Sequence, residues 1–151
     1  MAITTAMCTS FKQELLGGIH DLDTHVLKVA LIDATHTGTY GASTTNYSDV
    51  TGNSDEVGTS GTNYTTGGQA LDSVTISSAN GKAFVDIADE VFSSVSLSAS
   101  GCIIYNSSVA NEAICVIDFG GTQTASNGNF TIQFPPSTGS VDETNAIIRI
   151  E

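Results

Sequence analysis

The feature that most constrains the fold is the dipeptide Asn80-Gly81, which joins two stretches of alternating apolar and polar residues. A two-residue type I′ turn needs positive φ at both central positions, and Asn-Gly tolerates this better than most pairs. Such a short loop fixes the register and places Ile76 opposite Val85, with apolar residues on one face. Residues 84–91 also have helical spacing, but the hairpin accounts for more residues. We therefore predict a strand that continues to about Ile87.

Short apolar stretches recur along the rest of the chain, separated by Gly, Ser and Asn turns. VLKVALIDA is apolar on nearly both faces, which indicates a strand buried on both sides. Pro135-Pro136 ends the penultimate strand, because proline donates no ladder hydrogen bond. About eight short antiparallel strands describe a mainly β domain over residues 1–151, of the β-sandwich or jelly-roll type. Besides the hairpin, the predicted strands are 26–34, about 94–98, 102–106, 113–119, 129–134 and 145–150.

One short helix is predicted near the N-terminus. Ser10 and Gln13 have the spacing of a capping box, Phe11 and Leu15 share one helical face, and Gly17-Gly18 supplies a stop. A helix of this length is not stable alone in water, so we expect it to dock on the rest of the domain.

The segment 35–68 is polar over its whole length. Two valines are its only aliphatic residues larger than alanine, and Tyr40, Tyr47 and Tyr64 are scattered through it. This composition predicts a flexible excursion, since long loops without secondary structure are usually functional or disordered. We expect a partner, most simply a neighbouring subunit, to order this segment. We expect the same of an N-terminal arm over residues 1–10. The tyrosines could supply large contacts to that partner, or could pack on their own domain.

Two of the three cysteines, Cys102 and Cys115, lie in apolar stretches that form a predicted hairpin closed by Gly120-Gly121. They would face each other only if Ser108-Val109 formed a two-residue turn, and valine tolerates positive φ badly. Neither belongs to a CxxC pair and no histidine is nearby in sequence, so zinc or redox chemistry has little support. We predict that the cysteines are free thiols that pack in the core.

Candidate sites for metals or catalysis are weak. In HDLDTH, the spacing of His20 and His25 fits neither a helical metal site nor one face of a strand, and a polar turn explains the stretch. Residues 49–56, DVTGNSDE, offer oxygen ligands without the spacing of a calcium loop, and a solvated loop is the alternative. There is no G-x-S-x-G motif, P-loop or dinucleotide-binding glycine motif. We expect a non-enzymatic protein without cofactor or metal.

Charge narrows the range of partners. Four Lys and Arg stand against sixteen Asp and Glu, a formal net charge of -12, and such a surface repels nucleic acid and anionic membranes.

No stretch approaches the ~20 apolar residues of a membrane-spanning helix. MAITTAMCTSFK lacks the basic and apolar regions of a secretory signal, which argues against secretion by the usual route. With 18 serines and 20 threonines, the surface is made soluble by hydroxyls, as in β-rich extracellular or virion proteins.

Several stretches, taken in order, resemble small virion structural proteins of tailed bacteriophages. They are TSFKQELLGGIHDLDTHVLKVALID, YTTGGQAL, SASGCIIYNSSVANEAICVIDFGG, and FTIQFPP with AIIRI. The resemblance covers most of the chain outside residues 35–60. It implies a β-sandwich or jelly-roll module that decorates or cements a capsid, or belongs to a tail or fibre, and that is often trimeric. It brings no catalytic residues.

The resemblance leads to two hypotheses. The first is a capsid decoration or cement protein, made in the bacterial host cytoplasm and located on the virion surface, whose partners are the major capsid protein and its own copies in a homotrimer. The second is a tail or fibre component, or another adhesin, that binds a host-surface glycan or receptor. Glycan sites usually offer exposed aromatic platforms, so a chain with no Trp and 7% aromatic residues favours the first. The candidate partner contacts are Phe11, Tyr40, Tyr47 and Tyr64.

Overall fold

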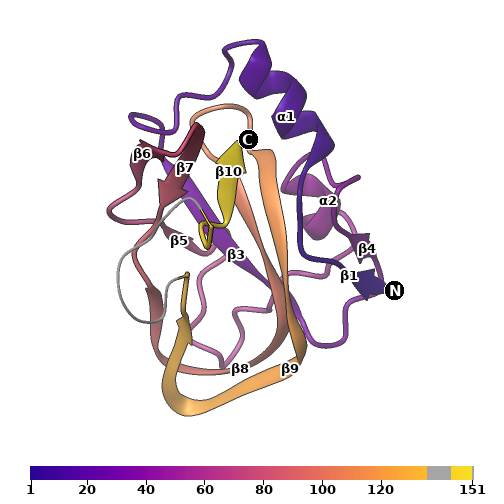
Figure 1. The fold of residues 1–151 in the computed structure, drawn as a ribbon. Coiled ribbons are helices and arrows are strands. Elements are labelled where there is room, and N and C mark those ends of the chain that lie inside the picture. Colours follow the sequence, from indigo (N-terminus) through magenta and orange to yellow (C-terminus); the bar gives the residue numbers. More distant parts are fainter. Residues whose placement is uncertain (136–143, 151) are drawn as a thin grey trace.

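The computed structural model describes residues 1–135 and 144–150. Its largest sheet has five antiparallel strands in the order β2-β9-β8-β3-β5 (Figure 1). A three-stranded antiparallel sheet, β10-β7-β6, and a parallel pair, β1 with β4, accompany it. The fold is therefore mainly β, as predicted. The strands are β1 (Ala2–Ile3), β2 (Ala6–Met7), β3 (Leu27–Asp33), β4 (Thr39–Tyr40), β5 (Gln69–Ala70), β6 (Thr75–Ala79), β7 (Lys82–Asp86), β8 (Glu90–Asn106), β9 (Glu112–Ile132) and β10 (Ile148–Ile150).

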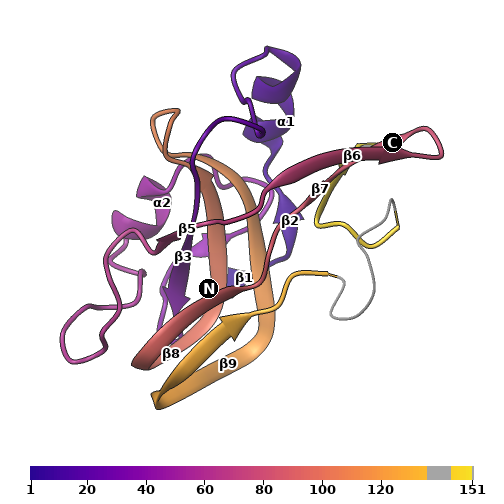
Figure 2. The same ribbon diagram turned by 90° about the vertical axis from the view of Figure 1, so that its left-hand side faces the viewer.

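The strands β8 and β9 form one long hairpin that bends strongly along its length (Figures 1 and 2). The sequence predicted four short strands here, and that division is wrong. Register shifts bend the ribbon without ending it: Ala99 pairs with Gln123 and Gly101 with Asp118, so residues 119–122 oppose Ser100 alone. Within this bulge Gly120 has φ 74°. The glycines predicted to close the hairpin therefore bend it in the middle of β9.

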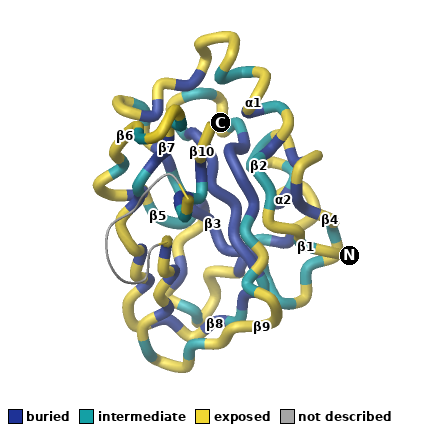
Figure 3. Tube along the Cα trace, viewed as in Figure 1, coloured by how far each residue is buried: buried dark blue, intermediate teal, exposed yellow. Residues whose placement is uncertain are grey.

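Strand β3 lies between β8 and β5 and is buried on both faces, as predicted. Its partner across the ladder is the Cys102 part of β8, where Leu31 pairs with Cys102 and Val29 with Ile104. The buried residues follow β3 and the adjoining parts of β8 and β9, so the core runs through the middle of the molecule (Figure 3).

The predicted Asn80-Gly81 hairpin is present as β6 and β7. Ala79 pairs with Lys82 and Ile76 with Val85, and both turn residues have positive φ, 50° and 79°. This confirms the predicted register, although β7 ends at Asp86, one residue early. The third strand of this sheet, β10, pairs with β7. The β6–β7 hairpin extends away from the five-stranded sheet (Figure 2).

The predicted N-terminal helix exists, as α1 (Thr9–Leu16), and a second helix, α2 (Ser48–Thr51), lies within the polar segment. The predicted cap is wrong: Cys8 is the N-cap of α1, and Ser10 Oγ is buried without a hydrogen-bond partner among the described residues. The helix does end at Gly17, and Phe11 is buried. No helix in the described ranges is long and apolar enough to cross a membrane.

The first eight residues run along the edge of the molecule's own sheets. Strand β1 pairs with β4, and Thr4 N–H donates to Tyr40 O at 2.9 Å. Strand β2 pairs with β9, and Cys8 N–H then donates to Ile114 O at 2.9 Å. The predicted arm is thus bound to the chain from which it comes.

Candidate functional site

The predicted excursion, residues 35–68, lies along the outer edge of β3, and we name it the sealing segment. Asp33 N–H donates to Asp55 O at 2.8 Å, and Leu31 O accepts from Val57 N–H at 3.1 Å. Leu31 N–H donates to the Tyr64 hydroxyl at 3.0 Å. The chain itself therefore supplies the ordering contacts that the sequence suggested a neighbouring subunit would provide.

Glu56 is the central anchor of the sealing segment. Its Oε2 accepts from the Tyr47 hydroxyl at 2.5 Å, and its Oε1 accepts from the Tyr64 hydroxyl at 2.9 Å and from Gly67 N–H at 2.7 Å. Burial, together with the Glu56 charge, raises the pKa of both tyrosines well above the ordinary value. Three donors from different parts of the segment thus converge on one carboxylate.

The end of the sealing segment packs against the five-stranded sheet. The Tyr105 ring of β8 stacks on Tyr47 with centroids 4.5 Å apart, and its hydroxyl donates to Gly67 O at 2.8 Å. Burial raises the Tyr105 pKa to about 12. Gly68 has φ +67°, and a Cβ there would lie 1.8 Å from Val29 O. Only glycine fits at this position.

Asp55 is the second anchor. It is 3% exposed, and its carboxylate accepts from Thr37 N–H at 2.8 Å, Gly38 N–H at 2.7 Å and the Tyr40 hydroxyl at 2.5 Å. Burial raises the pKa of Asp55, but these hydrogen bonds outweigh it and the net shift is downward. Burial and the bond to Asp55 raise the Tyr40 pKa to about 12. The beginning of the segment is therefore folded around this carboxylate.

The region considered as a calcium loop, residues 49–56, uses its carboxylates for these internal bonds. Asp49 Oδ2 accepts from Thr45 N–H at 2.8 Å and from Asn46 N–H at 3.3 Å, which supports the start of α2. Among the described residues, no group of three or more His, Cys, Asp or Glu side chains is placed to hold a metal ion. These acids act here as hydrogen-bond acceptors for backbone and tyrosine.

The four candidate partner contacts lie mostly inside the molecule. Phe11, Tyr40 and Tyr64 are at most 3% exposed, and Tyr47 is partly buried against Tyr105. This arrangement matches the alternative that the tyrosines pack on their own domain. The surface that could contact a partner must then be sought elsewhere.

The cysteines pack in the core, as predicted. Cys8, Cys102 and Cys115 are free and at most 2% exposed, and Cys102 lies opposite Ile117 rather than Cys115. Burial raises the pKa of all three thiols, that of Cys8 to about 12. A buried thiol with a raised pKa is a poor nucleophile and a poor metal ligand.

The two histidines of the HDLDTH turn meet at Asn106, which is fully buried. Asn106 Oδ1 accepts from Ser108 N–H at 3.0 Å, so its Nδ2 donates to Nδ1 of His20 at 3.0 Å and Nδ1 of His25 at 2.9 Å. His20 Nε2 lies 2.8 Å from Glu14. The predicted polar turn is present, but its histidines tie the turn to the end of β8, a role that their spacing did not indicate.

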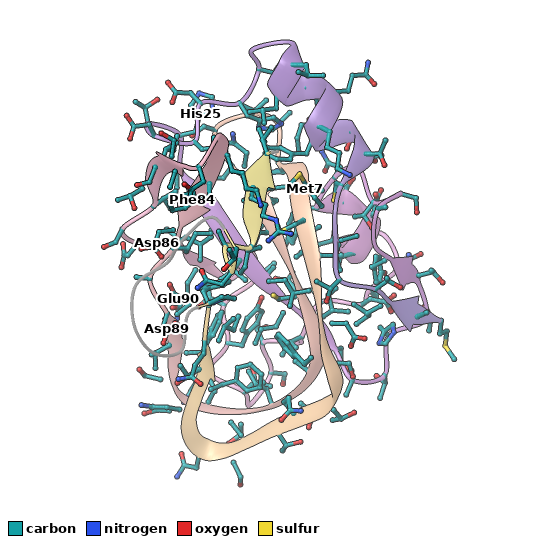
Figure 4. The ribbon with its side chains drawn as sticks, in the orientation of Figure 1. Met7, His25, Phe84, Asp86, Asp89 and Glu90 are labelled. Atoms are coloured by element: carbon teal, nitrogen blue, oxygen red, sulfur yellow. The ribbon has the colours of Figure 1, made fainter. Side chains whose placement is uncertain are left out.

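Acidic side chains also gather where β7 leads into β8. Figure 4 shows Asp86, Asp89 and Glu90 following one another there. Asp89 Oδ1 accepts from Phe134 N–H at 2.9 Å. Burial of Glu90, with the nearby Asp72 charge, raises the pKa of its carboxyl. A raised pKa means that the folded chain favours the protonated form of this carboxyl.

Two hollows in the described surface lie outside the sealing segment. One, of about 750 Å³, is lined by β9 and the segment before β10 and includes Phe119, Phe130 and Asn129. The other, of about 250 Å³, lies between the β6-β7-β10 sheet and the Leu15–Leu22 region. Comparison of the chain with known protein families, curated proteins and solved structures finds no match. The functional argument therefore rests on the molecule's own sequence and geometry.

Proposed function

We propose that this chain is a non-enzymatic structural protein of a tailed-bacteriophage virion, a decoration or cement protein on the capsid surface. Its partners are the major capsid protein and further copies of itself. In this proposal the main sheet and the smaller sheets correspond to the layers of a β-sandwich or jelly-roll module. The resemblance of the five sequence stretches motivates the assignment, and the partial cover of the edges of the main sheet supports it most directly.

A cement protein has to bind at many positions without growing into a filament, and open sheet edges promote such growth. In this molecule β2 and the Cys8 N–H cover the part of the β9 edge from Ile114 to Val116, and β5 and the sealing segment cover the β3 edge. These parts of the main sheet are closed to edge pairing, and in this proposal the contacts with a shell are made by side chains and loops.

The carboxylates and thiols that could do chemistry are bonded or packed within the chain itself. Asp55 and Glu56 are saturated with hydrogen bonds from their own chain, and the thiols are buried. A site of catalysis would instead offer a reactive group in a cleft with a second group to activate it. This arrangement supports a structural role rather than an enzymatic one.

The first experiment is the copy number of the protein in purified particles, measured by quantitative mass spectrometry against the major capsid protein. A decoration protein is present in a fixed high ratio to the capsid subunit. A few copies per particle, found only in isolated tails, would contradict the proposal.

The second experiment tests stabilisation of the shell. Particles produced without the protein are heated, and DNA release is followed with an intercalating dye. We expect release at a lower temperature, restored when purified protein is added back. As a control, an equal amount of an unrelated acidic protein should not restore it. Equal release temperatures with and without the protein would argue against a cement role.

The alternative, a tail or fibre protein that binds a host glycan, draws on the larger hollow. Its lining combines the Phe119 and Phe130 rings, 5.9 Å apart, with amide side chains such as Asn129, and sugars are bound by rings and amides together. Binding of a labelled host-surface polysaccharide that is lost in Asn129→Ala, together with location in the tail, would favour this alternative.

A further inference from the structure

Strand β6 is an open edge in the part of the chain that the structure describes. The main sheet ends at the two-residue strands β2 and β5. The small sheet ends at β6, a five-residue strand that no described strand pairs on its outer side. Four of the five β6 residues, 75–78, are exposed. This edge is therefore accessible to the strand of another chain.

The turn geometry shows which backbone groups of β6 are unpaired. In a two-residue hairpin the residues that flank the turn form a hydrogen-bonded pair, and such pairs alternate along the ladder. Ala79, Ser77 and Thr75 therefore bond to β7, while the N–H and C=O groups of Ile76 and Ser78 point away from it. Two donors and two acceptors face outward in regular order.

The composition of β6 permits contact between like chains. Each chain has a formal net charge of -12, so most faces of two copies repel each other. The strand TISSA has no charged residue, and it has neither the lysine nor the proline that commonly protects an edge strand. A second copy can approach along this strand without placing acids opposite acids.

We propose that β6 pairs antiparallel with β6 of a second copy of this chain, across a two-fold axis at Ser77. In this register Ser77 lies opposite the partner's Ser77, and Ile76 lies opposite the partner's Ser78. Each Ile76–Ser78 pair exchanges two hydrogen bonds, so all the outward groups of Ile76 and Ser78 are used. The two small sheets become one six-stranded sheet, and the symmetry closes the assembly at two copies.

The apolar side of β6 adds to this pairing. Ile76 is 51% exposed and shares a sheet face with Val85 and Ile148, above the smaller hollow. Residues on opposite sides of a two-fold axis perpendicular to the sheet keep the same face, so Ile76 and the partner's Ile76 lie on one side as diagonal neighbours. Their contact removes part of this exposed surface from water.

The expected association is weak and depends on concentration. Two five-residue strands bury less than the roughly 1,000 Å² that a stable interface needs, so we expect dimers at high protein concentration. On a crowded capsid surface a weak contact of this kind is strengthened because neighbours are held close together. The inference concerns the isolated chain, however, and does not depend on the proposed role in a virion.

Cysteine cross-linking of purified protein tests the register. Opposite residues at a site without ladder hydrogen bonds have Cα atoms about 4.5 Å apart, within the range that a disulfide spans. Under mild oxidation Ser77→Cys should form a covalent dimer at least ~10-fold faster than Thr75→Cys, because the two copies of residue 75 lie about 14 Å apart in this register. The native cysteines are buried and do not interfere.

Sedimentation equilibrium gives an independent test. The wild-type protein should show a monomer–dimer equilibrium, and Ser78→Pro should shift it toward monomer, because proline removes an outward N–H without affecting the bonds to β7. Unchanged far-UV circular dichroism verifies that Ser78→Pro folds. Equal cross-linking rates for Ser77→Cys and Thr75→Cys overturn the proposal, as does a wild type that stays monomeric or a trimer that does not cross-link at position 77.

Discussion

Glu56→Gln tests whether one carboxylate holds the sealing segment on β3. The substitution keeps the shape of the side chain and removes its charge. The amide oxygen can still accept from Tyr64 and Gly67, but the amide nitrogen cannot accept, so the Tyr47 hydroxyl has to accept from it instead. A hydrogen bond to a charged acceptor contributes about 1.5–3 kcal/mol and a neutral one about 0.5–1.5 kcal/mol, so the change costs roughly 1 kcal/mol for each donor. Relief from keeping a charge in a partly buried site offsets part of this.

We therefore expect Glu56→Gln to lower the free energy of unfolding by about 2 kcal/mol, which corresponds to roughly 4–8 °C in Tm for a chain of this size. Glu56→Ala, which leaves two tyrosine hydroxyls and one N–H without a partner, should cost about 4 kcal/mol. Urea titration followed by circular dichroism and tyrosine fluorescence measures both. Asp23→Asn, at an exposed acid, is the matched control and should lie within about 0.5 kcal/mol of wild type.

A double-mutant cycle of Glu56→Gln with Tyr64→Phe isolates the anchor itself. Tyr64 donates to Glu56 and accepts from Leu31 N–H, so it links the carboxylate to the sheet edge. The coupling energy should be about 1–2 kcal/mol, and both single variants should become sensitive to proteinase K within residues 35–68 before the rest of the chain. Additive effects within about 0.5 kcal/mol, with no early cleavage there, would refute the reasoning.

Three further predictions follow from the buried titratable groups. All four tyrosines have raised pKa values, and the chain has no Trp. Absorbance at 295 nm should therefore stay flat through pH 10, where free tyrosine is half ionised, and rise only near pH 12 as the fold is lost. Ordinary tyrosine titration near pH 10 in a folded protein would contradict this. Because the folded-state pKa of Glu90 is raised, its contribution to stability is present at low pH and lost as the pH rises through that pKa. Glu90→Gln should therefore stabilise the protein at pH 7 and not below pH 4, as measured by thermal melts; destabilisation at pH 7 would show that the carboxylate has a favourable partner. A thiol reagent such as maleimide should label none of the three cysteines rapidly until denaturant is added, and fast labelling of the folded chain would disprove their burial.

Local chemistry made part of the fold predictable. The Asn80-Gly81 turn fixed its own register, because only a few residue pairs adopt its backbone conformation and the flanking alternation agrees with it. The apolar stretch of β3 and the packing of Cys102 were equally clear, since neither depends on where distant residues lie.

The rest of the fold depends on long-range contacts, which the sequence does not reveal. Gly120-Gly121 reads as the end of a strand, yet it bends β9 because the ladder with β8 resumes beyond it. The helix begins before Ser10 because strand β2 and the Cys8–Ile114 bond fix the preceding backbone. In both cases tertiary pairing overrides a turn or capping signal that is correct in isolation.

The sealing segment shows the same limit at the candidate site. Beside Val50 and Val57, its buried side chains include the tyrosines Tyr40 and Tyr64 and the acid Asp55, so its composition resembles that of a solvated loop. Burial of these groups is favourable only when β3 and Gly67 are in place to complete their hydrogen bonds. A single sequence does not reveal that match, so it leaves open whether the tyrosines contact a partner or pack on their own domain.

The pairing of β2 with β9 also sets the order in which the chain can acquire its structure. Residues 6 and 7 are synthesised early, but their partners are Val116 and Cys115, more than a hundred residues later. The β8–β9 hairpin, by contrast, closes around a turn of only a few residues, and contacts that close short loops form first. We therefore expect folding to start at the β8–β9 hairpin, and residues 6 and 7 can be placed only after Cys115 and Val116 have been synthesised.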